Sequence, residues 1–264
     1  MAIRKPIFVI PIDLGAIATG NEISGKPASN LNRNKAIGLT WKSSGDTNLW
    51  VRGDLTTAKP IDFMTLISAN ALAGTLIRLR LGDTQAEVDG TADYDSTAVA
   101  FINPSITRAD GLYHSHLEIG ATYTKRWWRI DITGHTGDFE ASTLVLGQAI
   151  TPSRFYDIGF ERGVRDLGSL DFSRFGVFDE EEGAIFRTLD FTMAWQTEAE
   201  LEASFRPMVE SLGSRGVVLV VFDPEATTYR QAKTYLGVMA KPPFAKGTKK
   251  PATFAMDFSI TSMI

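Results

Sequence analysis

The chain of 264 residues contains no cysteine and only three histidines. Without cysteine it can form no disulfide, bind no metal through thiolates and use no cysteine nucleophile. Packing and hydrogen bonds must therefore hold the fold together. This composition is compatible with synthesis in a reducing cytoplasm.

Dense basic clusters and long apolar runs are also missing. The formal net charge is −4, and 22% of the residues are charged. Because nucleic-acid binding needs a basic stripe, we expect no nucleic acid as a specific partner. The apolar run 7–10 is interrupted by Pro11, so it is too short for a signal-peptide core or a membrane span. We expect no membrane insertion.

The familiar catalytic motifs are absent too. The sequence has no Gly-x-Ser-x-Gly nucleophile elbow and no glycine-rich phosphate loop. Asp89, Asp93 and Asp95 lie in one loop, but the glycine and terminal glutamate of an EF-hand are missing, so solvated turn residues are the simpler explanation. We predict that the chain is not an enzyme and uses no cofactor.

One short segment has the spacing of a metal site. His114, His116 and Glu118 would share one face of a strand. The alternative is a polar strand surface that faces solvent, since a metal would need a fourth ligand and supporting hydrogen bonds. We favour the second interpretation and predict no metal.

The first half has the pattern of short strands broken by turns. In residues 75–81 and 126–132, apolar side chains alternate with polar or charged ones, as expected for half-buried strands. Strands spaced about ten residues apart predict a β-sandwich or jelly roll over residues 21–148, and no helix is expected there. The inward positions of the two segments are Ile77, Leu79, Leu81, Trp128, Ile130 and Ile132.

The second half, residues 149–264, combines strands with one strong helix over 197–212. Thr197 and Glu200 have the spacing of a capping box, and Gly213 fits the C-terminal stop. Pro207 should kink this helix. We predict a β-barrel with one packed helix, so the whole chain is mainly β. A short strand within residues 1–20 is a candidate to pair with this half, which would make residues 21–148 an insertion.

Aromatic residues are the best indication of binding. Five of them fall in or near loops and outward strand positions of the first half, where aromatic side chains commonly stack on sugar rings or anchor protein contacts. The alternative for each is packing in the core, which is the more frequent role. The candidate ligand-binding residues are Trp41, Trp50, Tyr94, Tyr113 and Trp127.

Several segments resemble a known family. They are residues 27–32 (PASNLN), 40–43 (TWKS), 61–66 (IDFMTL), Asn70 and 126–132 (RWWRIDI). Together they make residues 21–148 similar to the galactose-binding-like, discoidin-type jelly roll, which often appears in bacteriophage tail proteins. Residues 149–264 resemble the β-barrel-plus-helix units of phage tail-tube and distal-tail proteins.

This resemblance implies a structural component of a phage tail tip or baseplate. Its C-terminal domain would form a homo-oligomeric ring, a hexamer by analogy, and contact other tail proteins such as the tube and hub. The β-sandwich would project outward and contact host glycans or neighbouring tail proteins. The protein would be assembled in the host cytoplasm and located in the virion. The alternative is a stand-alone carbohydrate-binding module of a surface protein.

Overall fold

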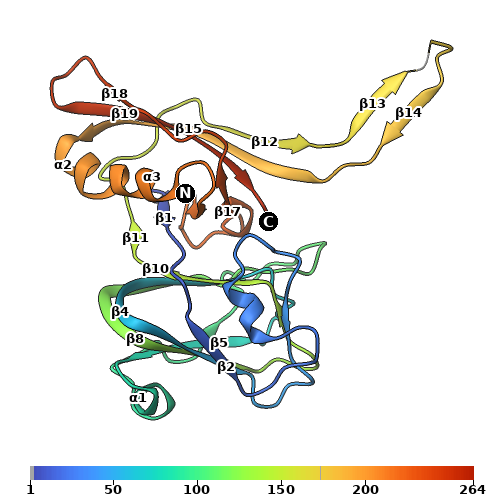
Figure 1. Ribbon diagram of the computed structural model, residues 1–264, viewed down its shortest axis with the longest axis vertical. Coiled ribbons are helices and arrows are strands. Elements are labelled where there is room, and N and C mark those ends of the chain that lie inside the picture. Colours follow the sequence, from blue (N-terminus) through green and yellow to red (C-terminus); the bar gives the residue numbers. More distant parts are fainter. Residues whose placement is uncertain (1–2, 173) are drawn as a thin grey trace.

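Two β-rich bodies lie one above the other, and a long hairpin projects from the upper one (Figure 1). The computed structural model describes residues 3–172 and 174–264. Residues 16–147 supply the strands of the lower body, whereas β1 (Ile7–Val9) and the strands after residue 148 form the upper body. The mainly β fold with one long helical segment is confirmed. Within the described ranges, no helix is long and apolar enough to cross a bilayer.

The lower body is built on a seven-stranded antiparallel sheet in the order β10-β4-β8-β5-β6, with β2 on β4 and β7 on β5. Its core lies between this sheet and a small second sheet, where Trp41 contributes to the same apolar cluster as Leu79 and Trp128. The strands are β2 (Ala16–Thr19), β4 (Trp50–Ile67), β5 (Leu76–Gly82), β6 (Tyr94–Asp95), β7 (Val99–Ala100), β8 (Leu117–Thr133) and β10 (Thr143–Gly147), with β3 (Trp41–Lys42) and β9 (Glu140–Ala141) in the small sheet.

The prediction that residues 20–148 lack helices was wrong in two places. A 3₁₀ turn, η1, covers Ala28–Asn32, and a short helix, α1, covers Gln85–Asp89. Thr84 and Glu87 make a reciprocal capping box at the start of α1. Because residues 82–95 are rich in turn residues, the capping signal of this short helix is hard to distinguish from a loop in the sequence.

The upper body is an eight-stranded antiparallel sheet in the order β11-β1-β16-β17-β19-β15-β12, with β18 on β19. It is open, since β11 and β12 end the order and no pairing joins them among the described residues. The predicted closed β-barrel is therefore corrected to an open sheet. The strands are β11 (Ala149–Ile150), β12 (Glu161–Asp166), β15 (Ile185–Thr197), β16 (Val217–Val221), β17 (Thr234–Met239), β18 (Ala245–Gly247) and β19 (Thr253–Ser262), with a 3₁₀ turn, η3, at Gln231–Lys233.

One helical segment packs on this sheet, as predicted. It consists of α2 (Glu198–Glu200), a π-helical turn η2 (Leu201–Phe205) and α3 (Arg206–Leu212). The Thr197 hydroxyl accepts a hydrogen bond from the Glu200 amide at 3.2 Å. The wider η2 turn directly precedes Pro207, which has no amide hydrogen to donate. The helix is therefore irregular on the N-terminal side of Pro207, whereas the kink itself stays a prediction.

The two bodies share a continuous apolar layer. Val217, Leu219 and Val221 of β16 pack with Phe63 and Val145 of the lower sheet. The upper sheet is therefore covered on both faces, by the helix on one side and by the lower body on the other. This explains why β16 is buried along its whole length.

A salt bridge also links the two bodies and predicts acid sensitivity. Arg4 donates to both oxygens of Glu118, at 2.7 and 2.6 Å, and His116 contacts Glu118 at 2.8 Å. Burial alone would raise the pKa of Glu118, but hydrogen bonds from His116 and Arg4 lower it to about 2.

Because the folded-state pKa is depressed, the ionised Glu118 stabilises the fold above its ordinary pKa, and this contribution is lost as pH falls from about 4.5 to about 2. We expect Glu118→Gln to lower the free energy of unfolding by about 1–2 kcal/mol at pH 7 and by much less near pH 2.5. Urea titrations of both proteins at the two pH values measure this; a pH-independent difference contradicts it.

Candidate functional site

The outer face of the lower sheet gathers three arginines from three adjacent strands. Side chains alternate along each strand, so Val51 and Ile130 point to the core while their neighbours point outward. The register places Arg52 of β4 opposite Arg129 of β8, and Arg129 opposite Arg80 of β5. Like charges placed side by side repel one another unless carboxylates lie between them.

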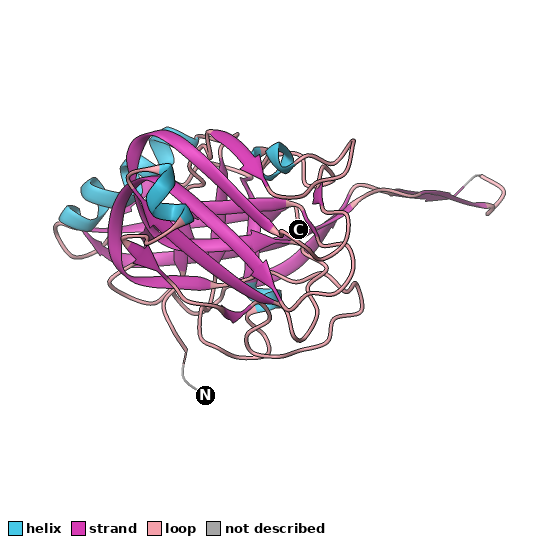
Figure 2. Ribbon diagram, turned by 90° about the horizontal axis from the view of Figure 1, so that it is seen from below, coloured by secondary structure: helices cyan, strands magenta, loops and turns pink. Residues whose placement is uncertain are grey.

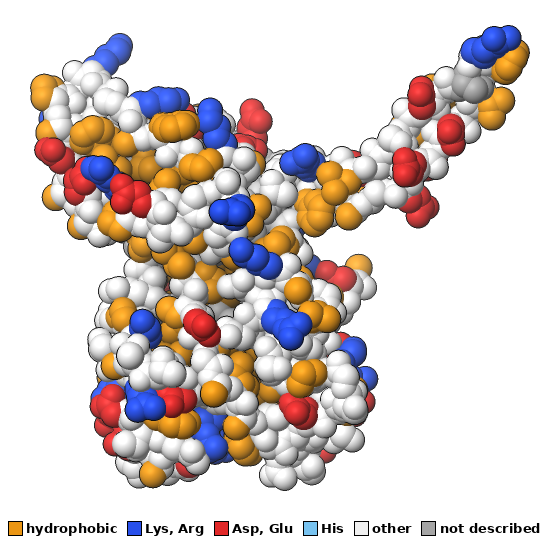
Figure 3. Space-filling model, viewed as in Figure 1, with side chains coloured by type: hydrophobic (Ala, Val, Ile, Leu, Met, Phe, Trp, Pro, Cys, Tyr) orange, Lys and Arg blue, Asp and Glu red, His pale blue; other side chains and the backbone are white. Residues whose placement is uncertain are grey.

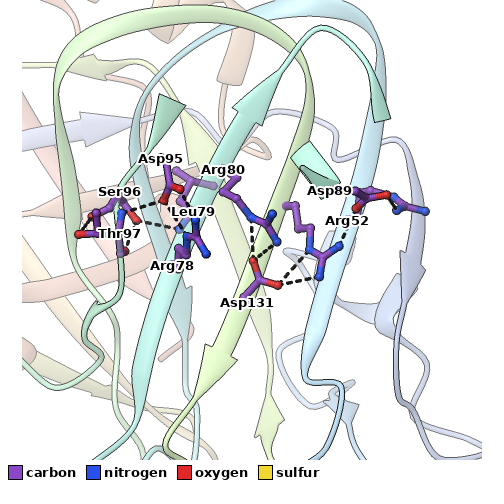
Figure 4. Close-up of polar contacts among 10 residues, drawn as sticks. Arg52, Arg78, Leu79, Arg80, Asp89, Asp95, Ser96, Thr97 and Asp131 are labelled. Carbon is purple, nitrogen blue, oxygen red and sulfur yellow. Dashed lines mark hydrogen bonds and ion pairs between the residues drawn. The ribbon is translucent and has the colours of Figure 1, made fainter. Parts of the chain in front are cut away.

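Two aspartates supply that compensation (Figure 4). Asp131 accepts from Arg80 at 2.6 Å through one oxygen and from Arg129 at 2.8 Å through the other. Asp89 accepts from Arg129 at 2.6 Å and also pairs with Arg52. The result is a continuous row in which guanidinium and carboxylate groups alternate across the sheet.

A fourth arginine extends this network toward β6. Arg78 lies next to Asp131 in the register and pairs with Asp95, its Nε donating at 2.7 Å. The hydrogen bond from Arg78 lowers the pKa of Asp95. We call these four arginines and three aspartates, together with Trp50, the arginine face. Its charged members are Arg52, Arg78, Arg80, Arg129, Asp89, Asp95 and Asp131. Its four arginines and three aspartates leave one positive charge.

The short helix α1 places Asp89 on this face. The capping box at Thr84 begins the helix, and Gly82 lets it approach the sheet, since a Cβ there would lie 2.9 Å from Glu87. Asp89 is the last residue of α1. Burial alone would raise its pKa, but hydrogen bonds from Arg52 and Arg129 lower it. The carboxylate is therefore ionised at neutral pH.

Trp50 is the aromatic component of the arginine face. Its indole is half-buried, and the guanidinium groups of Arg129 and Arg52 lie 4.6 and 5.2 Å from the ring centre. Such cation–π contacts fix the ring in one orientation. The Nε of Arg52 is buried without a hydrogen-bond partner, so one donor in this cluster is unsatisfied.

The other four aromatic candidates differ in position. Trp127 lies on the same outer face, with Arg126 over its ring at 6.0 Å. Tyr94 is partly buried, and its ring centre lies 4.8 Å from that of Tyr123. Trp50 and Trp127 therefore share the outer face, but the register places them four residue pairs apart along β4 and β8.

Trp41 and Tyr113 were expected in or near exposed positions, and they are buried. Trp41 is 1% exposed, packs edge-on against Phe139 and donates its indole N–H to the Asn21 carbonyl at 3.1 Å. Tyr113 is 8% exposed, and its hydroxyl accepts from the Arg108 amide. Packing and hydrogen bonding within the fold account for both side chains.

Of the three residues with the spacing of a metal site, His116 and Glu118 meet, but His114 does not join them. His114 is buried, and its Nδ1 accepts from the Ser68 amide at 3.0 Å. Burial lowers its pKa to about 3, so it is neutral. His116 instead contacts Glu118, which is already bound to Arg4. His114 and His116 precede β8, which begins at Leu117, so the alternation of side chains along a strand does not place all three residues on one face.

Asp89, Asp93 and Asp95, which were expected as solvated turn residues of one loop, each pair with a basic side chain instead. Asp89 and Asp95 belong to the arginine face, whereas Asp93 pairs with Lys125. A different group, Asp83, Glu87 and Asp93, does bring three carboxylates together. The Lys125 ammonium donates to Asp83 at 2.7 Å and to Asp93, and these hydrogen bonds raise its pKa. A cation of the chain's own thus occupies this position.

The arginines were the residues that sequence reasoning missed. Alternation identified Arg78, Arg80 and Arg129 as outward residues, but only the register of β4 against β8 shows that Arg52 joins them. The capping signal at Thr84 and Glu87 could have revealed α1, and with it the position of Asp89.

No protein-family profile and no curated protein matches the chain. Among the similar solved structures are carbohydrate-binding modules. A fucose-binding module from Streptococcus pneumoniae shares 9% identity with a TM-score of 0.39, covering 53% of this chain and 95% of its own. Chitosan-binding module 1 of a Paenibacillus sp. IK-5 chitosanase/glucanase shares 12% (TM-score 0.37; 53% and 98% covered).

A third similar structure is the module CBM32-1 of a family 31 glycoside hydrolase from Clostridium perfringens. It shares 13% identity with a TM-score of 0.38, and the match covers 53% of this chain and 96% of that one. Values this low identify neither a ligand nor a binding residue in this chain.

Proposed function

We propose that the lower body is a non-catalytic saccharide-binding module and that the arginine face is its binding surface. The observation that carries this proposal is the half-buried indole of Trp50, held beside fixed guanidinium and carboxylate groups. A sugar offers an apolar C–H face that can stack on an aromatic ring, and hydroxyls that both donate and accept. Because Arg129 and Asp131 are held by their neighbours, they would bind such hydroxyls with little loss of conformational entropy.

The test is binding to a glycan array followed by calorimetry with the best ligand. We expect Trp50→Ala to weaken binding about tenfold, which corresponds to about 1.4 kcal/mol, because the stacking surface is lost while the fold is kept. Trp195→Ala is the matched control, since Trp195 is 43% exposed and lies in the upper body. No glycan bound at millimolar concentration, or an equal loss in the control, contradicts the proposal.

A second role is favoured by the hairpin that projects from the upper body. We propose that the chain is also a structural component of a larger assembly, a phage tail tip or baseplate, in which residues 149–264 associate into a ring. Such a protein would be located in the virion after assembly in the host cytoplasm, and neither role involves a catalytic step. The observation behind this role is a two-stranded arm with exposed apolar side chains.

Light scattering after size exclusion tests the second role. We expect particles larger than a monomer at concentrations of about 100 μM, and a ring in negative-stain images. A strictly monomeric chain at this concentration contradicts self-association.

A further inference from the structure

The arm is an amphipathic hairpin. It begins with the pairing of β12 and β15 and continues through β13 (Ser169–Phe172) and β14 (Phe178–Glu181). Phe172 lies opposite Phe178 with ring centres 5.5 Å apart, and Leu170 lies on the same side two residues away. The opposite side carries Asp171, Asp179 and Glu181, whereas Glu180 lies opposite Leu170 on the same side as the phenylalanines. One side of the arm is therefore mainly apolar and the other acidic.

The apolar side of the arm faces solvent. Leu170, Phe172 and Phe178 are 60%, 61% and 53% exposed. Figures 1 and 2 show the arm leaving the body, with no other described segment packed along its outer portion. A two-stranded hairpin alone is marginally stable in water, and clustered exposed apolar side chains mark an interaction surface. The surface that covers this side must come from another molecule.

The same sheet carries a second unusual surface at its far end. Residues 241–250 contain four lysines and no acid. Phe244 in this segment is 63% exposed and borders an apolar groove between the helix and β19. We call this groove with its lysines the seat. Its apolar lining is Leu201, Val209, Phe244, Phe254 and Met256, and Glu202, Arg206 and Glu210 line it on the helix side, where Arg206 pairs with both glutamates. The lysines of the segment are Lys241, Lys246, Lys249 and Lys250, of which Lys246 pairs with Asp257.

The arm and the seat differ in charge. Residues 161–185 contain seven acids and three arginines, whereas the seat segment is wholly basic. Figure 3 shows acidic and apolar side chains along the arm, with basic ones at its tip, and a mixture of apolar, basic and acidic side chains on the opposite lobe. The arm segment and the seat segment nevertheless carry opposite net charges beside exposed apolar side chains. Complementary potentials of this kind steer association and fix its register.

Their positions in the fold define the geometry of contact. β15 runs from Ile185, at the base of the arm, to Thr197. Near its end, Gln196 pairs with Phe254, which lines the seat. The two surfaces therefore lie at opposite ends of one sheet, so a chain cannot place its own arm on its own seat. Unlike surfaces at opposite ends produce head-to-tail contacts, which close into a ring or continue as a filament.

We infer that the arm of one copy docks on the seat of the next copy. The apolar side of the arm covers Phe244 and the groove, and its carboxylates pair with the lysines at the rim. This inference rests on the proposed self-association and assigns the two surfaces that carry it.

The first test uses the absence of native cysteine. Leu170→Cys on the arm and Phe244→Cys on the seat are made in separate full-length chains, mixed and gently oxidised. We expect a disulfide between the two variants in the mixture, well above the amount of symmetric dimer that each forms alone. Symmetric dimers only, or no cross-linking in a chain that still oligomerises, overturns the assignment.

The second test reverses charge. Lys249→Glu with Lys250→Glu on the seat, or Asp179→Lys with Glu180→Lys on the arm, should each weaken association at least about tenfold by light scattering. Mixing the two variants should restore association of the reversed arm with the reversed seat. Lys35→Glu with Lys59→Glu is the control, with the same charge change on exposed residues of the lower body.

The outcomes distinguish self-association itself from the assignment of its two surfaces. A monomeric unmodified chain contradicts self-association itself. An oligomer that survives both reversals and gives no arm-to-seat disulfide leaves self-association standing but contradicts these surfaces.

Discussion

Replacing Phe8 by alanine is expected to lower the free energy of unfolding by about 3–5 kcal/mol, the range observed for fully buried aromatic residues. Phe8 is 0% exposed, and its ring centre lies 5.1 Å from Phe258, 5.7 Å from Phe205 and 6.0 Å from Phe191. These contacts come from β19, the helical segment and β15. The cavity would therefore open at the junction of three elements, where no single one can move to fill it.

Denaturant titration followed by tryptophan fluorescence measures this effect. Tyr229→Ala is the control, because Tyr229 is 57% exposed and the loss should stay within about 0.5 kcal/mol. A loss below about 1 kcal/mol for Phe8→Ala would mean that β1 contributes little to the upper core. The predicted large loss would instead show that the first ten residues and the last eighty fold as one unit.

Local patterns explain why much of the fold was predictable. On β5, Ile77, Leu79 and Leu81 are at most 1% exposed, as their alternation with arginines indicates. At the helix, the Thr197 side chain caps the first turn, and Gly213 follows Leu212 with a φ of 52°. These signals depend only on neighbours within a few residues, so a sequence displays them directly.

The predicted capping box at the same helix formed only in part. Thr197 accepts from Glu200, but the Glu200 carboxylate accepts instead from the amide and hydroxyl of Ser153, at 2.7 Å each. A partner 47 residues away competes with the local one. Sequence spacing cannot reveal such a competitor, because it comes close only in the folded chain.

The arm was the largest feature that local patterns did not predict. The acidic run 179–183 has the composition of a loop, yet Asp179–Glu181 belong to strand β14. The arm has apolar residues at strand spacing but no core beneath them, so the pattern resembled that of an irregular loop. The open sheet was missed for a similar reason, since strand order and closure depend on pairings far apart in the sequence.

Removing the Asp131 carboxylate is the second change with a large expected effect. Asp131→Ala leaves Arg80 and Arg129 without their shared acceptor, and their side chains are only 8% and 16% exposed. Breaking a buried pair costs about 3–5 kcal/mol because a charge stays uncompensated. Partial solvent access reduces this cost here, so we expect a loss of about 2–4 kcal/mol in the free energy of unfolding.

Asp110→Ala is the matched control for that prediction. Asp110 also pairs with an arginine, Arg108, but its side chain is 45% exposed, so the loss should be about 0–1 kcal/mol. Equal losses of unfolding free energy in the two variants would mean that the ion pairs of the arginine face are as well solvated as an ordinary surface ion pair. A larger loss for Asp131, together with weaker glycan binding, is expected if the network both stabilises the sheet and holds Arg129 against Trp50. The double variant Asp131→Ala with Arg80→Met should then recover part of the stability but not the binding, because Arg129 would be held by Asp89 alone.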